Sequence, residues 1–166
     1  MTPKLRILLW VVAIAIPADQ LCKLLVESTL EPGDRLAVVD GFLYIAHARN
    51  PGAAFGLFGS AQSEVRFAAF VTVSLAAIAV IAAFYRRLAP GDRAQSLGLS
   101  LVLAGASGNF IDRLWRGEVI DFLHVRLWGG YAWPDFNLAD LCIVMGVASL
   151  MIDLLSREGI SRASNG

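Results

Sequence analysis

The sequence predicts an integral membrane protein that is mainly α-helical, with four transmembrane helices and a small extracytoplasmic β-structure. The first observation is composition: 57% of the 166 residues are hydrophobic and 17% are charged, against about 45–50% and about 25% in soluble domains. The second is charge balance, since fourteen basic and fourteen acidic residues cancel, which argues against a nucleic-acid partner. The third is that two cysteines are too few for a disulfide-rich secreted domain.

Four mainly apolar segments approach the length of about 20 residues that a helix needs to cross a bilayer. Within a single expected domain, 1–166, they cover residues 7–26, 67–85, 94–111 and 138–155. The first segment reaches spanning length only by including Asp19, Gln20 and Lys23. Its short apolar start after Lys4 and Arg6 also fits a cleaved signal peptide. Because three further spans follow, we expect a retained helix.

The distribution of basic residues predicts that both termini are cytoplasmic. Four spans place the termini and the short connection 88–93 on one side, where seven of the fourteen Lys and Arg residues fall, and basic residues concentrate on the cytoplasmic side. The other side holds β-prone segments at 35–49, around Asp40-Gly41, and at 124–133, around Gly129-Gly130. That side also carries the aromatic residues expected at a membrane interface: Trp115, Trp128, Tyr131 and Trp133.

Ionisable residues at membrane depth are costly, so each one is a candidate functional residue. Asp19 and Lys23 are four residues apart on one helix face. We expect them to form a structural ion pair, with Lys23 extending outward to the membrane surface. At the end of the third span, Asn109, Asp112 and Arg113 share one face. They follow a stripe of small residues suited to close helix packing: Ser100, Ala104 and Gly108.

Two more acids stand close to the ends of spans. Asp121 lies between apolar neighbours, and Asp140 follows Asn137 where the last span begins, so that Asn137 can cap this helix. The turn sequence around Asn50 is followed by small residues from Gly52 onward, which permit close approach of another chain segment. Metal-ligand spacing is lacking among Cys22, His47, His124 and Cys142, so no metal site is expected.

Five motifs occur in a fixed order along the chain. They are Asp19-Gln20-x-x-Lys23, Asn50-x-Gly52-Ala53-Ala54-Phe55-Gly56, Gly108-Asn109-x-x-Asp112-Arg113, Val119-x-Asp121-Phe122 and Phe136-Asn137-x-Ala139-Asp140. Together they closely resemble bacterial lipoprotein signal peptidase, also called signal peptidase II, from the first span to the last. The departure lies in Ala46-His47-Ala48-Arg49, where a threonine and apolar residues are familiar, and it leaves the acids untouched.

The resemblance implies an intramembrane aspartic endopeptidase of the bacterial cytoplasmic (inner) membrane, with its active site near the extracytoplasmic face. Its implied substrate is a diacylglyceryl-modified prolipoprotein, cut just before the lipid-modified cysteine. The chain is expected to act in contact with membrane lipid, as a monomer and without a cofactor. By resemblance, Asp121 and Asp140 are catalytic, four residues bind substrate (Asn50, Asn109, Arg113 and Asn137), and four support the site (Asp19, Lys23, Gly52 and Asp112).

Two carboxyl groups brought close together cannot both ionise cheaply, so they share a proton and titrate as a pair. This matches peptide hydrolysis, in which one acid activates water and the other donates a proton. The outer loops, with Trp128, Tyr131 and Trp133, are expected to close over the peptide. Two alternatives stay open: a small transporter or channel that uses the intramembrane carboxylates, and a non-enzymatic membrane adaptor that docks partners on its outer β-structure.

Overall fold

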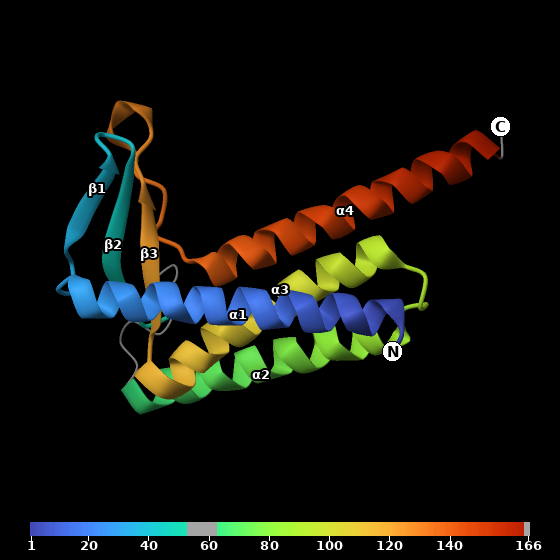
Figure 1. Cartoon of the computed structure of the whole chain (residues 1–166), viewed down its shortest axis with the longest axis horizontal. Helices are drawn as coiled ribbons and strands as arrows, with labels where there is room; N and C mark the ends of the chain where they lie inside the picture. Colours follow the sequence, from blue (N-terminus) through green and yellow to red (C-terminus); the bar gives the residue numbers. More distant parts are fainter. Residues whose placement is uncertain (53–62, 165–166) are drawn as a thin grey trace.

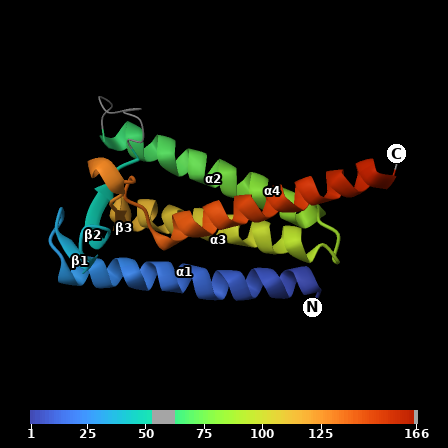
Figure 2. The ribbon, with the colours of Figure 1, turned by 90° about the horizontal axis from the view of Figure 1, so that it is seen from above.

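The computed structural model describes residues 1–52 and 63–164. Four long helices run side by side in alternating directions (Figure 1). They are α1 (Pro3–Thr29), α2 (Ser63–Arg87), α3 (Arg93–Arg116) and α4 (Leu138–Ser164). A small sheet packs at one end of the helices, and both chain termini lie at the other end (Figures 1 and 2). The four helices contain the four apolar segments expected from the sequence.

Local signals explain where the helices begin and end. Thr2 caps α1 by accepting a hydrogen bond from the backbone N–H of Leu5, and Pro3 occupies the first helical position, where no N–H is needed. α3 ends at Gly117, whose φ of +79° suits the left-handed conformation that commonly closes a helix. α4 begins with a cap formed by Asn137, which belongs to the candidate site described below.

Three of these helices are long and apolar enough to cross a membrane: α1, α2 over Glu64–Arg87, and α4 over Leu138–Arg157, taking the described residues alone. Large apolar side chains on them face outward, among them Trp10, Val73 and Ile152. α3 lies between the other helices and contacts all of them (Figure 2). Its buried side is lined by small or polar residues: Ser96, Gly98, Ser100, Ala104, Gly105, Gly108, Asn109 and Asp112.

The buried small residues allow α3 and α4 to approach closely. A Cβ on Gly98 would come within 3.0 Å of the carbonyl oxygen of Gly146, and one on Gly105 would overlap the carbonyl oxygen of Ala139. The expected small-residue stripe is therefore confirmed, since Ser100, Ala104 and Gly108 are all buried. Close packing of this kind replaces the hydrophobic effect as the force that holds helices together in lipid.

The sheet has three antiparallel strands in the order β1 (Arg35–Val39), β2 (Leu43–Asn50) and β3 (Val119–Val125). The expected hairpin around Asp40-Gly41 is present, with Gly41 at φ +76°. The compact hairpin expected around Gly129-Gly130 is also present, although the strand that leads into it begins earlier than expected, at Val119. Residues 126–132 form a tight connection, closed by a bridge between Arg126 and Ala132. β3 is largely buried and carries Asp121 and His124 among its apolar residues, so it lacks the apolar–polar alternation that marks a half-buried strand.

Candidate active site

Asp121 and Asp140 come from different elements and are joined by one asparagine. Asp121 is the third residue of β3, and Asp140 is the third residue of α4. Asn137 donates a hydrogen bond from Nδ2 to Asp121 Oδ1 at 2.7 Å, and its Oδ1 accepts the backbone N–H of Asp140 at 2.9 Å. In return, Asp140 Oδ2 accepts the backbone N–H of Asn137 at 3.2 Å. This reciprocal cap confirms Asn137 as the N-cap of α4 and fixes both carboxyl groups.

Two further amides complete the surroundings of the acids. Asn50 donates to Asp121 Oδ2 at 3.0 Å, and Asn109 donates to Asp140 Oδ1 at 2.8 Å. All four carboxyl oxygens therefore accept a hydrogen bond. Nδ2 of Asn137 has two protons but three acceptors within reach, because Asn109 Oδ1 (3.1 Å) and the carbonyl oxygen of Ile120 (3.3 Å) lie near it as well. This amide thus ties α3 to β3 and to the start of α4.

Asp121 is the more enclosed of the two acids, with 3% of its surface exposed. Burial disfavours the charged carboxylate and raises the pKa of Asp121 to about 6, and the negative charge of Asp140 acts in the same direction. The hydrogen bonds from Asn50 and Asn137 oppose this shift because they stabilise the ionised form. A carboxyl group with this pKa exchanges its proton close to neutral pH, as an acid–base catalyst requires.

Lys23 lies in the interior and contradicts the expectation that it extends to the membrane surface. Its side chain is 0% exposed, and Nζ is 2.6 Å from a carboxylate oxygen of Asp19 and 2.6 Å from one of Asp112. Nζ also donates to Asn109 Oδ1 at 3.3 Å. The expected pair with Asp19 is present. Asp112 on the neighbouring helix supplies the second negative charge, so the buried ammonium group has two counter-charges.

The carboxylates held by Lys23 also bind the backbone next to each catalytic candidate. Asp112 Oδ2 accepts the N–H of Ile120 at 3.4 Å, and Asp19 Oδ1 accepts the N–H of Ala139 at 3.0 Å. Ile120 directly precedes Asp121, and Ala139 directly precedes Asp140. Lys23 therefore links the carboxylate that holds the backbone before Asp121 to the one that holds the backbone before Asp140, across α1, α3, β3 and α4.

Sequence reasoning gave no role to Gln20, Glu27 or Arg116 in this cluster. Gln20 donates to Asp112 Oδ1 at 2.9 Å, and Arg116 pairs with the same oxygen at 2.8 Å. Arg116 also pairs with Glu27 at 2.7 Å. The signal was available in the spacing, because Arg116 follows Asp112 by one helical turn, and Gln20, Lys23 and Glu27 recur on one face of α1.

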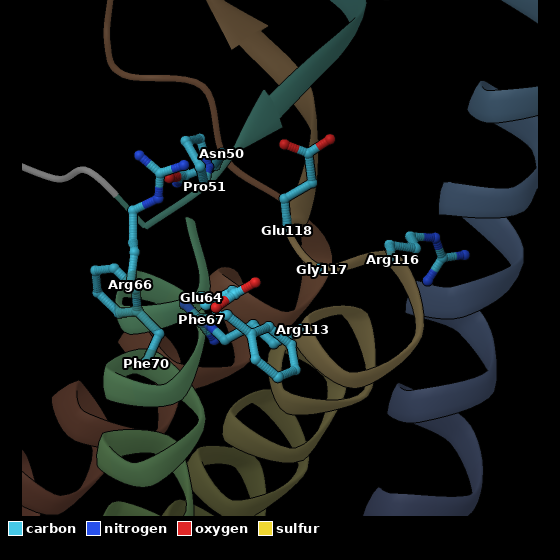
Figure 3. Close-up of a pocket in the computed structure, with 10 residues that line it drawn as sticks. All are labelled: Asn50, Pro51, Glu64, Arg66, Phe67, Phe70, Arg113, Arg116, Gly117 and Glu118. Carbon is cyan, nitrogen blue, oxygen red and sulfur yellow. The ribbon is translucent and has the colours of Figure 1, made fainter. Parts of the chain in front are cut away.

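A cleft of about 410 Å³ opens beside the acids, between the end of β2, the start of α2 and the end of α3 (Figure 3). Asn50 belongs both to this cleft and to the carboxyl cluster. Arg113 lies in the cleft, with its guanidinium 5.8 Å from the ring centre of Phe70, and Arg66 extends toward Asn50 (Figure 3). Arg116 lines the edge of the cleft but points away from it toward α1 (Figure 3).

Gly52 is the last described residue of the motif that begins at Asn50. Its φ of +84° favours glycine, and a Cβ there would collide with the ring of Phe70. Asn50 accepts the Gly52 N–H on its own Oδ1 at 3.0 Å, which fixes the amide that faces Asp121. The rest of the motif, 53–56, lies outside the described residues. Among those described, no three His, Cys, Asp or Glu side chains are grouped in a way that could hold a metal ion.

Comparison with known proteins gives this arrangement a family. Residues 11–156 match the sequence model of the family described as Signal peptidase (SPase) II. The chain belongs to the signal peptidase II family. It is therefore a peptidase, which replaces the transporter and adaptor interpretations. The resemblance seen in the five ordered motifs is confirmed.

Individual relatives cover nearly the whole chain. The lipoprotein signal peptidase of Geobacter metallireducens is 42% identical over 158 residues, which is 95% of this chain and 96% of the relative. That of Geobacillus kaustophilus is 38% identical, covering 87% and 90%. Two solved structures, described as a bacterial membrane enzyme studied by the in meso method, are each 32% identical. Their TM-scores are 0.79 and 0.80, and they cover 90% and 89% of this chain and 87% and 92% of their own chains.

Proposed function

We propose that this signal peptidase II family member is an intramembrane aspartic endopeptidase. Its substrate is a diacylglyceryl-modified prolipoprotein, and it cleaves the peptide bond just before the lipid-modified cysteine. The observation that supports this proposal most strongly is the joint attachment of Asp121 and Asp140 to Asn137. Two carboxyl groups that influence each other's protonation, with a cleft beside them, are the chemical requirement for aspartic peptide hydrolysis.

In the proposed reaction the two acids begin with one proton between them. The ionised carboxylate removes a proton from water, and the resulting hydroxide attacks the peptide carbonyl carbon, while the protonated carboxyl donates its proton to the carbonyl oxygen. In the collapse of this tetrahedral diol the protonated carboxyl gives its proton to the leaving amine as the C–N bond breaks. The ionised carboxylate takes a proton from a hydroxyl of the diol as the carbonyl re-forms, which returns the pair to a single shared proton. The pKa of Asp121, near 6, keeps this exchange accessible at neutral pH.

The surrounding polar residues divide into two groups in this proposal. Asn50 and Arg113 line the cleft and are placed to bind the substrate backbone. Asn109 and Asn137 donate to the acids, so they act first by orienting the carboxyl groups. Asp19, Lys23 and Asp112 are positioning residues, because they reach the acids through the backbone of Ala139 and Ile120.

We further propose that all four helices span the cytoplasmic membrane of a bacterium, with the sheet and the acids near the extracytoplasmic face. Both termini lie at the end of the helices away from the sheet (Figure 1), which fits the cytoplasmic concentration of basic residues. α3 spans as the central helix, shielded from lipid by its neighbours despite its polar residues. A single chain contains both acids, so we propose that the enzyme works as a monomer in contact with membrane lipid.

The test is processing of a diacylglyceryl-modified prolipoprotein in membranes that contain the full chain. Asp121→Asn and Asp140→Asn should each abolish cleavage, because neither amide can supply the second carboxyl group. Asp153→Asn is the matched control: it makes the same change in α4, where Asp153 pairs with Arg157 far from the acids, and should cleave normally. Near-normal cleavage by either of the first two variants would refute the catalytic pair.

The outer β-structure is proposed to close over the bound peptide and exclude bulk water. Trp128, Tyr131 and Trp133 are exposed on the connection that follows β3, where they are available to a ligand. Shortening the hairpin between β1 and β2, or nicking it with a protease, should slow turnover while leaving the helices folded. Unchanged turnover after either treatment would exclude this role.

A further inference from the structure

A second groove lies between α1 and α3, at the end of the helices away from the sheet. Its volume is about 450 Å³, and it is distinct from the cleft beside the acids. α1 lines it with Arg6, Ile7, Trp10 and Val11, and α3 lines it with Arg93 and Leu97. The two helices contact each other along this seam. The groove therefore combines apolar walls with two guanidinium groups from different helices.

The two arginines carry charge that the fold does not use. Both are exposed, and within the described part of the chain neither Arg6 nor Arg93 forms an ion pair or a side-chain hydrogen bond. Two other cations at this end are engaged: Lys4 donates to the carbonyl oxygens of Arg86 and Leu88, and Arg157 pairs with both Asp92 and Asp153. Asp92, which directly precedes Arg93 in sequence, is thus already occupied by another partner.

The walls of the groove are apolar and open to the outside. Trp10 is 67% exposed and Leu97 is 43% exposed, although both lie on membrane helices beside charged side chains. Tryptophan is enriched where the lipid headgroups meet the acyl chains. A ligand that satisfies both parts of this groove needs an anionic group for the arginines and a hydrocarbon chain for the walls.

We propose that this groove binds one phospholipid with an anionic headgroup, whose phosphate lies between Arg6 and Arg93 and whose acyl chain runs along Trp10 and Leu97. Basic pockets between transmembrane helices are suited to such headgroups. The apolar walls favour a lipid over a free phosphate ion, and the two unpaired cations favour an anionic over a zwitterionic lipid. This site is independent of the peptidase reaction, because it lies at the opposite end of the helices from the acids.

The test uses the full chain in zwitterionic detergent with Trp10 as its single tryptophan, after Trp115→Phe, Trp128→Phe and Trp133→Phe. Brominated phosphatidylglycerol and brominated phosphatidylcholine are titrated separately, since bromine on a bound acyl chain quenches the fluorescence of Trp10. Two arginines near a membrane surface correspond to a preference of roughly thirtyfold for the anionic lipid. Equal affinity for the two lipids would refute the proposal.

Two double variants that remove the same charge distinguish binding in the groove from a general attraction of anionic lipid to the positive charge at this end of the helices. Arg6→Gln with Arg93→Gln should remove most of the preference, whereas Arg86→Gln with Arg87→Gln should keep it, because these two exposed residues end α2 and do not line the groove. An equal loss in both double variants would overturn the proposal. Displacement of the brominated lipid by millimolar inorganic phosphate would also overturn it, because the site would then bind a free anion.

Discussion

Replacing Lys23 with methionine removes the positive charge that Asp19 and Asp112 share, while it keeps most of the side-chain volume. The two carboxylates differ in how many partners they keep after Lys23 is replaced. Asp112 retains Arg116 at 2.8 Å and Gln20 at 2.9 Å. Asp19 retains no cation in the described chain and keeps the N–H of Ala139 at 3.0 Å. The substitution therefore leaves one nearly fully buried carboxylate without a counter-charge.

The magnitude follows from burial. The side chains of Lys23, Asp19 and Asp112 are 0%, 1% and 0% exposed, and both ion pairs measure 2.6 Å. Removing one partner from a buried pair costs about 3–5 kcal/mol, whereas an exposed pair is worth about 0–1 kcal/mol. We expect Lys23→Met to lower the free energy of unfolding by about 3–5 kcal/mol. Peptidase activity should fall as well, because the supports under Asp121 and Asp140 are coupled through Lys23.

Unfolding of the purified chain in mixed micelles, titrated with denaturing detergent and followed by circular dichroism, measures this free energy. The double variant Lys23→Met with Asp19→Asn is the matched control, since it removes the stranded carboxylate along with the cation. It should be clearly more stable than Lys23→Met alone. A loss below about 1 kcal/mol in Lys23→Met, unaffected by the second change, would refute the argument and favour an exposed lysine.

Other predictions concern the acids and the helix contact beneath them. Asn50→Ala removes a hydrogen bond that lowers the pKa of Asp121. The limb of the pH–rate profile that reports the ionisation of Asp121 should therefore move to higher pH. A limb that does not move would contradict the catalytic role of Asp121. The pKa of Asp121 in the folded chain lies near 6, above the ordinary 3.8. Ionisation of Asp121 should therefore lower the free energy of unfolding as pH rises from about 4 to about 6. Asp121→Asn should flatten this pH dependence when unfolding is measured across the same range. Gly105→Ala should lower the free energy of unfolding by about 1–3 kcal/mol and reduce turnover, because the added methyl group overlaps the carbonyl oxygen of Ala139. Gly91→Ala is the control, because a Cβ at Gly91 meets open space, and it should change neither stability nor turnover.

The sequence predicted the helices and the first hairpin because their signals are local. A long apolar run specifies a membrane helix whatever its neighbours are, and the turn residues Asp40-Gly41 specify a hairpin. The pairing of Asp19 with Lys23 was also predictable from helical spacing. In each case the residues that form the structure lie within a few positions of one another.

The features that escaped prediction depend on contacts between distant segments. Lys23 was expected at the surface because its second carboxylate, Asp112, comes from another helix. The strand that carries Asp121 pairs with β2, which lies far from it along the chain, so the sequence of the strand gave no indication of its partner. Likewise, the support of Ile120 by Asp112 exists only once α3 and β3 pack together.

The Lys23 cluster imposes an order on how the chain assembles. α1 is synthesised before α3 and α4, so Lys23 and Asp19 are present before Asp112 and the start of α4 have been made. Before α3 and α4 are made, neither Asp112 nor the N–H of Ala139 is available to this charged face of α1. The contacts that bury Lys23 and Asp19 therefore form only once α3 and α4 are present, and the segments that carry Asp121 and Asp140 are made together with these helices. Assembly of the proposed catalytic pair and burial of the α1 charges therefore depend on the same packing of α1, α3 and α4.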